Sequence, residues 1–174
     1  MVRRIFIILI YTLVIAACSQ LPVVRPQDFS LTLEWDTGSL PPQYTYMYVI
    51  NLGPGLEGEL VYRPGYDPND ISQQWMASFS IKEKQMEELF AYLESQDLFR
   101  SKWKQGEVME GSPGSNLILQ ADGQEFHVPS ISELDRNEFV LVDNAIEAIR
   151  ALVPKTIWDE MDARQTEYET NFEE

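Results

Sequence analysis

Residues 116–128 read Asn-Leu-Ile-Leu-Gln-Ala-Asp-Gly-Gln-Glu-Phe-His-Val, with two largely apolar runs on either side of Asp122-Gly123. Asp-Gly suits the left-handed backbone of a two-residue turn, and between apolar runs it is a strong hairpin signal. We therefore predict strands at 116–121 and 125–128, and with them an antiparallel sheet.

Further strands are predicted on both sides of the first predicted helix. Apolar and polar residues alternate over 29–35 and 75–79, which is the period of a half-buried strand. Residues 44–50 and 59–63 form another predicted hairpin, because the segment between them carries three glycines and Pro54. Residues 98–104 also alternate, and we predict a strand there.

Two helices are predicted from their start signals and apolar stripes. Ser80 and Glu83 have the spacing of a capping box, and an apolar stripe with the 3.6-residue period follows over 86–93. Asp135 and Glu138 indicate a second helix start, and its stripe runs from Phe139 to about residue 152.

A final acidic helix is predicted after Pro154, because proline suits a first helical turn. The order of strands, helix, strands, helix predicts the α+β class. We expect an antiparallel or mixed β-sheet with two main helices packed on one face and a C-terminal acidic helix.

The N-terminal segment has the layout of an export signal. Arg3 and Arg4 precede an uncharged apolar run over 5–17, which ends in small residues before Cys18. A membrane span requires about twenty apolar residues, so this run is too short to cross a bilayer.

Residues 15–18, Ile-Ala-Ala-Cys, resemble the lipobox of bacterial lipoproteins, with Ile at the usual Leu position. The resemblance implies that residues 1–17 are a signal peptide that is removed and that Cys18 carries a diacylglycerol. Residues 18–28 would then be the lipidated cysteine and an extended tether, and 29–174 a single domain. The alternatives are an uncleaved N-terminal helix and a cysteine that follows an ordinary secretory cleavage site.

The implied location is extracytoplasmic, lipid-anchored to the cell membrane or the outer membrane; Ser19 after the cysteine favours the outer membrane by analogy with the family. The mature part also resembles uncharacterised bacterial lipoprotein domains in its order of elements, a resemblance that implies no activity.

Charge restricts the partners. The chain has 13 basic and 28 acidic residues and a formal net charge of −15. Removal of residues 1–17 takes away Arg3 and Arg4 but no acid, so 11 basic residues remain and the charge becomes −17. Nucleic acid and anionic lipid headgroups would repel such a protein, so membrane attachment must come from the lipid anchor.

The sequence offers little for catalysis or cofactor binding. His127 is the only histidine, which excludes a His-rich zinc site, and no nucleophile motif accompanies it. We interpret it as a half-exposed strand residue. Asp67 and Asp70 lie in a loop that lacks the EF-hand pattern, and 53–55 form a turn with no phosphate-binding lysine. We predict no metal and no cofactor.

Two candidate partner surfaces stand out. Arg100, Lys102 and Lys104 would share one face of the strand predicted at 98–104, either to meet an acidic partner or to protect a sheet edge. The tyrosines of the strand at 44–50 would form a recognition ladder or pack beneath a helix. These tyrosines are Tyr44, Tyr46 and Tyr48.

These observations predict a lipid-anchored cell-envelope protein that is a binding, sensing or assembly module of unknown ligand, with an envelope protein as a candidate partner. One alternative is an envelope hydrolase with paired carboxylates, either Glu107 and Glu110 or Asp67 and Asp70. The other is a protease-inhibitor-like module that presents the loop at 106–114.

Overall fold

The computed structural model describes residues 24–65, 73–108 and 110–172. Within these ranges the chain forms a six-stranded sheet, three α-helices and two short 3₁₀ turns, so the predicted α+β class is confirmed. Cys18 and the pair Asp67 and Asp70 lie outside the described residues. The strands are β1 (Ser30–Asp36), β2 (Tyr46–Leu52), β3 (Glu57–Pro64), β4 (Trp75–Ser80), β5 (Gly114–Ala121) and β6 (Gln124–Val128); the helices are α2 (Glu83–Ser95), α3 (Arg136–Arg150) and α4 (Lys155–Asn171), and the turns are η1 (Pro42–Tyr44) and η3 (Ile131–Glu133).

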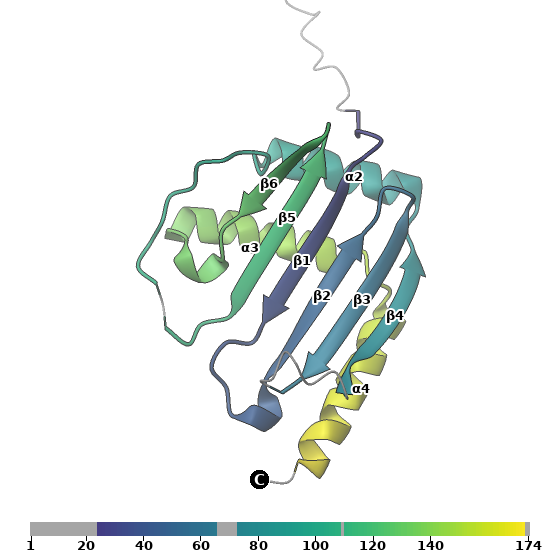
Figure 1. Cartoon of the computed structure of the whole chain (residues 1–174), viewed down its shortest axis with the longest axis vertical. Helices are drawn as coiled ribbons and strands as arrows, with labels where there is room; N and C mark the ends of the chain where they lie inside the picture. Colours follow the sequence, from purple (N-terminus) through teal and green to yellow (C-terminus); the bar gives the residue numbers. More distant parts are fainter. Residues whose placement is uncertain (1–23, 66–72, 109, 173–174) are drawn as a thin grey trace, which may run out of the picture.

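The sheet has the strand order β4-β3-β2-β1-β5-β6, and every neighbouring pair is antiparallel (Figure 1). Of the two sheet types predicted, the antiparallel one is therefore observed. β1 lies in the interior of the sheet between β2 and β5, whereas β4 and β6 form its two edges.

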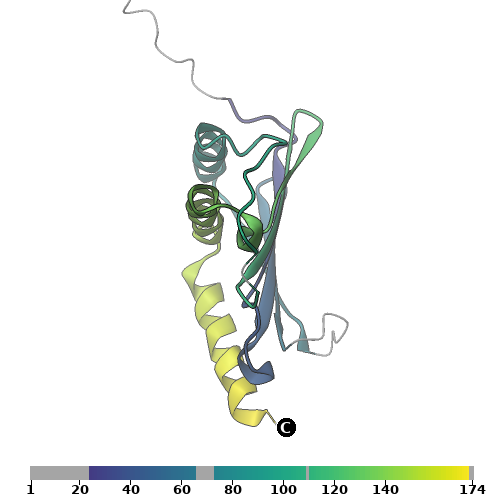
Figure 2. The ribbon, with the colours of Figure 1, turned by 90° about the vertical axis from the view of Figure 1, so that its left-hand side faces the viewer.

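The two faces of the sheet differ because side chains alternate along each strand. Leu33, Ile50, Leu60 and Leu117 point to the face that carries the core and are fully buried. In Figure 2 the three helices lie on the same side of the sheet. Their buried residues belong to the same core cluster as the strand residues: Met86, Leu89, Phe90 and Leu93 of α2; Val142, Ala145, Ile146 and Ile149 of α3; Met161 of α4.

The predicted hairpin at Asp122-Gly123 is confirmed. Both residues have positive φ, 51° and 71°, as a type I′ turn requires. The carboxylate of Asp28 accepts hydrogen bonds from both turn amides, at 2.9 Å from Asp122 N and 2.6 Å from Gly123 N. Asp28, the last residue of the predicted tether, thus binds the hairpin turn of the sheet.

The predicted start of α2 is wrong. Ser80 is the last residue of β4, paired with Glu57, and the helix begins at Glu83 after Lys82. The Gln85 side chain accepts a hydrogen bond from Lys82 N at 3.2 Å and supplies half of a capping arrangement. The start of α3 is as predicted, because the Asp135 carboxylate accepts from Asn137 N and Glu138 N.

The strand predicted at 98–104 is also wrong. This segment is an irregular connection after α2 and forms no strand pairing. Among the described residues, an isolated β-bridge joins the next residue, Gln105, to Leu134. Leu98 is fully buried, and the Phe99 ring packs against Phe90 at 5.3 Å. The alternation thus arises from contacts with helices and a ring cluster, not from strand pairing.

Candidate binding site

A row of aromatic rings crosses the core face of the sheet from the β4 edge inward. The Trp75 and Tyr62 rings stack at 5.5 Å between centroids with 15° between planes, and Trp35 stacks on Tyr48 at 5.3 Å and 16°. These residues are cross-strand neighbours, since Tyr62 lies opposite both Trp75 and Tyr48. Aromatic cross-strand pairs stabilise a sheet and hold each ring in a fixed orientation.

The three tyrosines proposed as a recognition ladder do not share a surface. Tyr48 is 1% exposed, and Tyr46 is half-buried and stacks on Tyr62 at 5.1 Å. Tyr44 lies in η1 and is exposed. Burial disfavours the phenolate and raises the pKa of the Tyr46, Tyr48 and Tyr62 hydroxyls above their ordinary value. Tyr46 and Tyr48 therefore follow the alternative prediction, packing beneath a helix.

Helix α4 covers the part of the aromatic row formed by Tyr48 and Tyr62. The Trp158 ring meets Tyr48 edge-on at 5.3 Å, and Met161 is 1% exposed. The buried amide of Gln165 donates to the backbone oxygen of Gln43 at 3.1 Å, which joins α4 to η1. These contacts hold the first and middle turns of α4 against β2 and η1.

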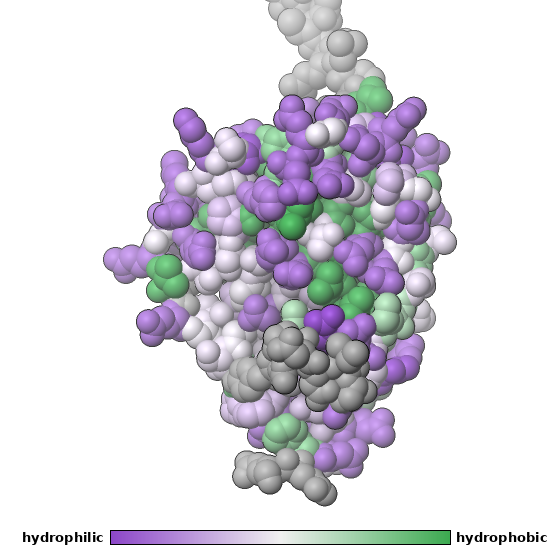
Figure 3. Space-filling view, viewed as in Figure 1, coloured by the Kyte–Doolittle hydropathy of each residue, from purple (hydrophilic) through white to green (hydrophobic). Residues whose placement is uncertain are grey.

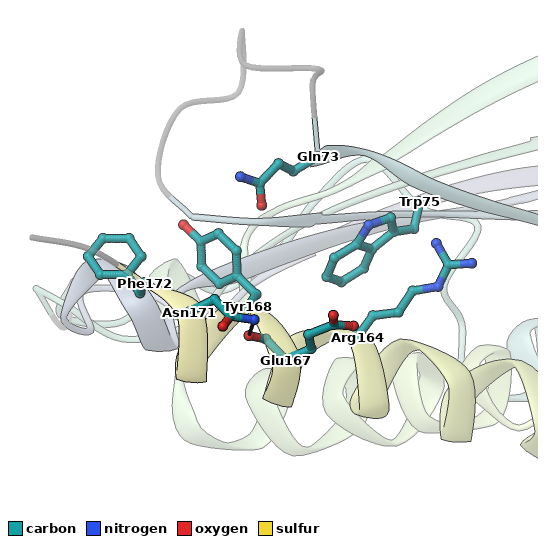
Figure 4. Close-up of a pocket in the computed structure, with 7 residues that line it drawn as sticks. All are labelled: Gln73, Trp75, Arg164, Glu167, Tyr168, Asn171 and Phe172. Carbon is teal, nitrogen blue, oxygen red and sulfur yellow. Dashed lines mark hydrogen bonds between the residues drawn. The ribbon is translucent and has the colours of Figure 1, made fainter.

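A groove lies where α4 passes the start of β4, and we call it the α4–β4 groove (Figure 4). It encloses about 550 Å³ and is open to solvent. Its walls combine aromatic rings, side-chain amides and one charge of each sign. The lining residues are Gln73, Trp75, Arg164, Glu167, Tyr168, Asn171 and Phe172.

The groove side chains are held by local contacts. The Arg164 guanidinium lies 5.7 Å from the Trp75 ring centroid and pairs with Glu160 at 2.6 Å. The Tyr168 and Phe172 rings meet edge-on at 5.6 Å, and Asn171 Nδ2 donates to the Glu167 backbone oxygen at 2.9 Å. Such a surface can stack on flat groups and exchange hydrogen bonds, which is the chemistry of recognition.

The three basic residues proposed as a partner surface do not act together. Arg100 forms an ion pair with Glu138, and its guanidinium lies 4.1 Å from the centroid of the Trp103 ring. Its side chain is 24% exposed and is used inside the domain. Lys102 and Lys104 are exposed but share no strand face, since this segment is not a strand.

The residues considered for catalysis are not assembled into a site in the described part of the chain. His127 Nε2 lies 2.7 Å from Glu125 Oε1 on β6, at the sheet edge opposite the α4–β4 groove. Glu107 and Glu110 are exposed and do not line the groove. No group of three or more His, Cys, Asp or Glu among the described residues could hold a metal ion.

The loop at 106–114 is tied to the domain at several points. Gly106 N donates to Glu133 O at 2.8 Å, Ser39 N donates to Gly111 O at 3.1 Å, and Gly114 N donates to the Asp36 carboxylate at 3.3 Å. These bonds hold both ends of the loop against η3 and the segment that follows β1.

The groove was not predicted from the sequence, because its walls come from segments that are distant in the chain. The sequence offered only Trp75 at the start of a predicted strand and Tyr168 on the predicted final helix. No protein-family model matches the chain, and no curated protein matches it. Within the described residues, no helix has the length and apolar character needed to cross a bilayer.

Proposed function

We propose that this protein is a lipid-anchored module of the cell envelope that binds a partner through the α4–β4 groove. The observation that carries the binding proposal is the groove itself, with stacked and edge-on aromatic rings beside amide side chains. Lipid attachment at Cys18 is supported by the lipobox-like sequence and by the need for an anchor other than charge.

The proposal takes α2 and α3 as the two main helices packed on one face of the sheet, with α4 as the element that makes the site. In this arrangement α2 and α3 supply the core, whereas α4 has only Met161 and Gln165 buried and leaves Glu167 and Asn171 for a ligand. The location is the cell membrane or the outer membrane, on the extracytoplasmic side.

The alternatives have less support. A hydrolase requires two carboxylates across a cleft, and Glu107 and Glu110 stand on an exposed loop. An inhibitor-like module requires a projecting loop, whereas 106–114 is bonded to the domain at both ends.

The anchor is tested by metabolic labelling of the full-length chain with a radioactive fatty acid. Cys18→Ser should abolish the label and block cleavage of the signal, and Ser19→Ala is the matched control that should leave both intact. Unchanged labelling of Cys18→Ser would refute lipid attachment at this residue.

The groove is tested separately by cross-linking in whole envelopes. A photo-reactive amino acid at Gln73 should give a discrete cross-linked product, and Asn171→Arg in the same chain should remove that product by placing a long charged side chain at the groove wall. Thr170→Arg, the adjacent exposed position that does not line the groove, is the control. A product that survives Asn171→Arg would argue against the groove as the binding site.

A further inference from the structure

Among the described residues, strand β4 forms an edge of the sheet and lacks the charges and prolines that usually protect such an edge. In the described part of the chain it pairs only with β3, and in Figure 1 it is the last strand on its side of the sheet, with α4 passing behind its start. Its sequence, Trp-Met-Ala-Ser-Phe-Ser, contains no charged residue, proline or glycine. Proteins usually blunt exposed edges with charges, prolines or bulges, since unpaired backbone groups attract another strand.

The opposite edge gives an internal comparison. β6 is shorter than β4, and it carries Glu125 and His127, which contact one another at 2.7 Å. Charged or polar groups of this kind discourage pairing. The two edge strands therefore differ in charge. Of the two, only β4 has no charged residue and is suited to pairing with an added strand.

The side chains of β4 are incompletely covered on both faces. Trp75, Ala77 and Phe79 belong to the core face and are only partly buried. On the other face Met76 is 57% exposed and lies opposite the buried Val61. This face presents apolar groups among polar ones (Figure 3). An added strand with apolar residues at alternate positions would cover the exposed sides of Trp75, Ala77 and Phe79.

Negative charge near β4 favours basic residues at the positions of the added strand that face the uncovered side of the sheet. Glu59 lies opposite Ser78 and Glu57 lies opposite Ser80 on the uncovered face. Neighbouring strands are about 4.8 Å apart, so an added strand would lie about 10 Å from β3. Glu59 also accepts a hydrogen bond from Asn51 Nδ2 at 3.5 Å, so it lies on the β2 side of the strand. A lysine or arginine of the added strand would extend across the small serines toward the negative charge of these two residues. A second copy of this chain, with its net charge of −15, would instead be repelled.

We propose that β4 binds an extended segment of a partner protein in which apolar and basic residues alternate, so that the segment adds a seventh strand to the sheet. The inference rests on the proposed binding function and names the partner class and the mode of binding. Trp75 belongs to both β4 and the α4–β4 groove, so one end of the added strand would lie beside the groove. Main-chain hydrogen bonds supply affinity, and the alternate side chains supply specificity.

The test uses the full-length protein in detergent and a fluorescent, end-capped peptide of alternating valine and lysine, followed by anisotropy. Residues of one parity in an added strand direct their N–H groups toward β4, and those of the other parity direct them away. N-methylation of all valines or of all lysines should therefore abolish binding in one case and spare it in the other. Equal effects of the two peptides, or equal binding of a peptide with the lysines and valines in separate blocks, would overturn the proposal.

Protein variants locate the binding strand. Met76→Lys places a positive charge on the β4 edge and should weaken peptide binding about tenfold, a change of about 1.4 kcal/mol. Val140→Lys is the matched control, since Val140 is a 50% exposed apolar residue of α3, and it should bind like wild type. Thermal unfolding of both variants verifies that they remain folded. Equal affinity of the two variants would refute β4 as the site.

Two further outcomes separate this inference from the proposed function. A concentration-dependent dimer of the protein alone that Met76→Lys dissolves would identify a second copy as the occupant and overturn the peptide proposal. If the Gln73 cross-link forms and responds to Asn171→Arg while the peptide does not bind, the groove function stands and strand addition falls. If the peptide binds but no cross-link forms in envelopes, strand addition stands and the groove assignment falls.

Discussion

Arg100 and Glu138 form an ion pair between the connection that follows α2 and the first turn of α3. The Glu138 residue is 8% exposed, whereas the Arg100 side chain retains contact with solvent and also lies over Trp103. The pair therefore joins two helices through a segment that has no regular secondary structure.

Arg100→Ala should lower the free energy of unfolding by about 2 kcal/mol, because it leaves the Glu138 carboxylate buried without its partner. The loss should be smaller than for a fully buried pair since Arg100 is partly exposed. Urea denaturation measures the change. The double change Arg100→Met and Glu138→Leu should recover most of the loss, and the exposed Arg136→Ala should have little effect. Similar losses for Arg100→Ala and Arg136→Ala would contradict this role.

Gly106→Ala should destabilise the domain because the new methyl group would meet backbone. A Cβ at this position would lie 2.6 Å from the Leu134 carbonyl oxygen, and that backbone belongs to the bridge with Gln105. We expect a loss of about 2 kcal/mol, within the range of strained insertions. Gln105→Ala, an exposed neighbour, should change the thermal midpoint much less. An unchanged midpoint for Gly106→Ala would show that this contact adjusts at no cost.

Asp28 should contribute to the acid limb of stability. The hydrogen bond from Gly123 N is the largest of the backbone hydrogen bonds that hold the pKa of its carboxyl below the ordinary value of 3.8. A smaller one comes from Asp122 N. Because the pKa is lower in the folded state, this contribution is present above pH 3.8 and is lost as pH falls through the folded-state pKa. Asp28→Asn should flatten the decline of the thermal midpoint in acid. The exposed Glu125→Gln, which leaves the turn bonds in place, should decline like wild type.

The buried tyrosines should limit stability in alkali. Their pKa values are raised by burial, so the folded state favours the neutral hydroxyls, and this stability is present below pH 10.0 and lost as pH rises above it. The Tyr48 hydroxyl is buried and has no hydrogen-bond partner in the described part of the chain. Tyr48→Phe should therefore leave neutral stability unchanged or raise it by up to about 1 kcal/mol, and it should extend the folded range in alkali. Tyr44→Phe, at an exposed site, should do neither. The same alkaline midpoint of unfolding in Tyr48→Phe and wild type would contradict a contribution from Tyr48.

Local signals predicted the elements that local contacts determine. Asp122-Gly123 and Asp135 act on their own neighbours, and both the hairpin and the start of α3 are where they were expected. Ser80 met the same spacing rule as a cap, but pairing of β4 with β3 placed it in a strand. The pairing of Ser80 with Glu57 thus outweighed the local preference of Ser80 for a helix cap.

Alternation failed at 98–104 for a related reason. Phe99 packs on Phe90, and Arg100 turns to Glu138, so neighbouring residues point in opposite directions without a partner strand. The α4–β4 groove could not be predicted because Trp75 and Tyr168 are distant in the sequence. They line one groove only after α4 packs against the sheet.

The first described residues and the end of α4 lie at opposite ends of the longest axis of the domain (Figure 1). If Cys18 carries the lipid, the chain enters the domain at the end nearest the bilayer, and Trp75 and the groove residues of α4 stand at the far end. The domain would then act as a spacer, with its binding site directed away from its own membrane, and a partner on an opposing surface would be within easier reach than one embedded beside the anchor.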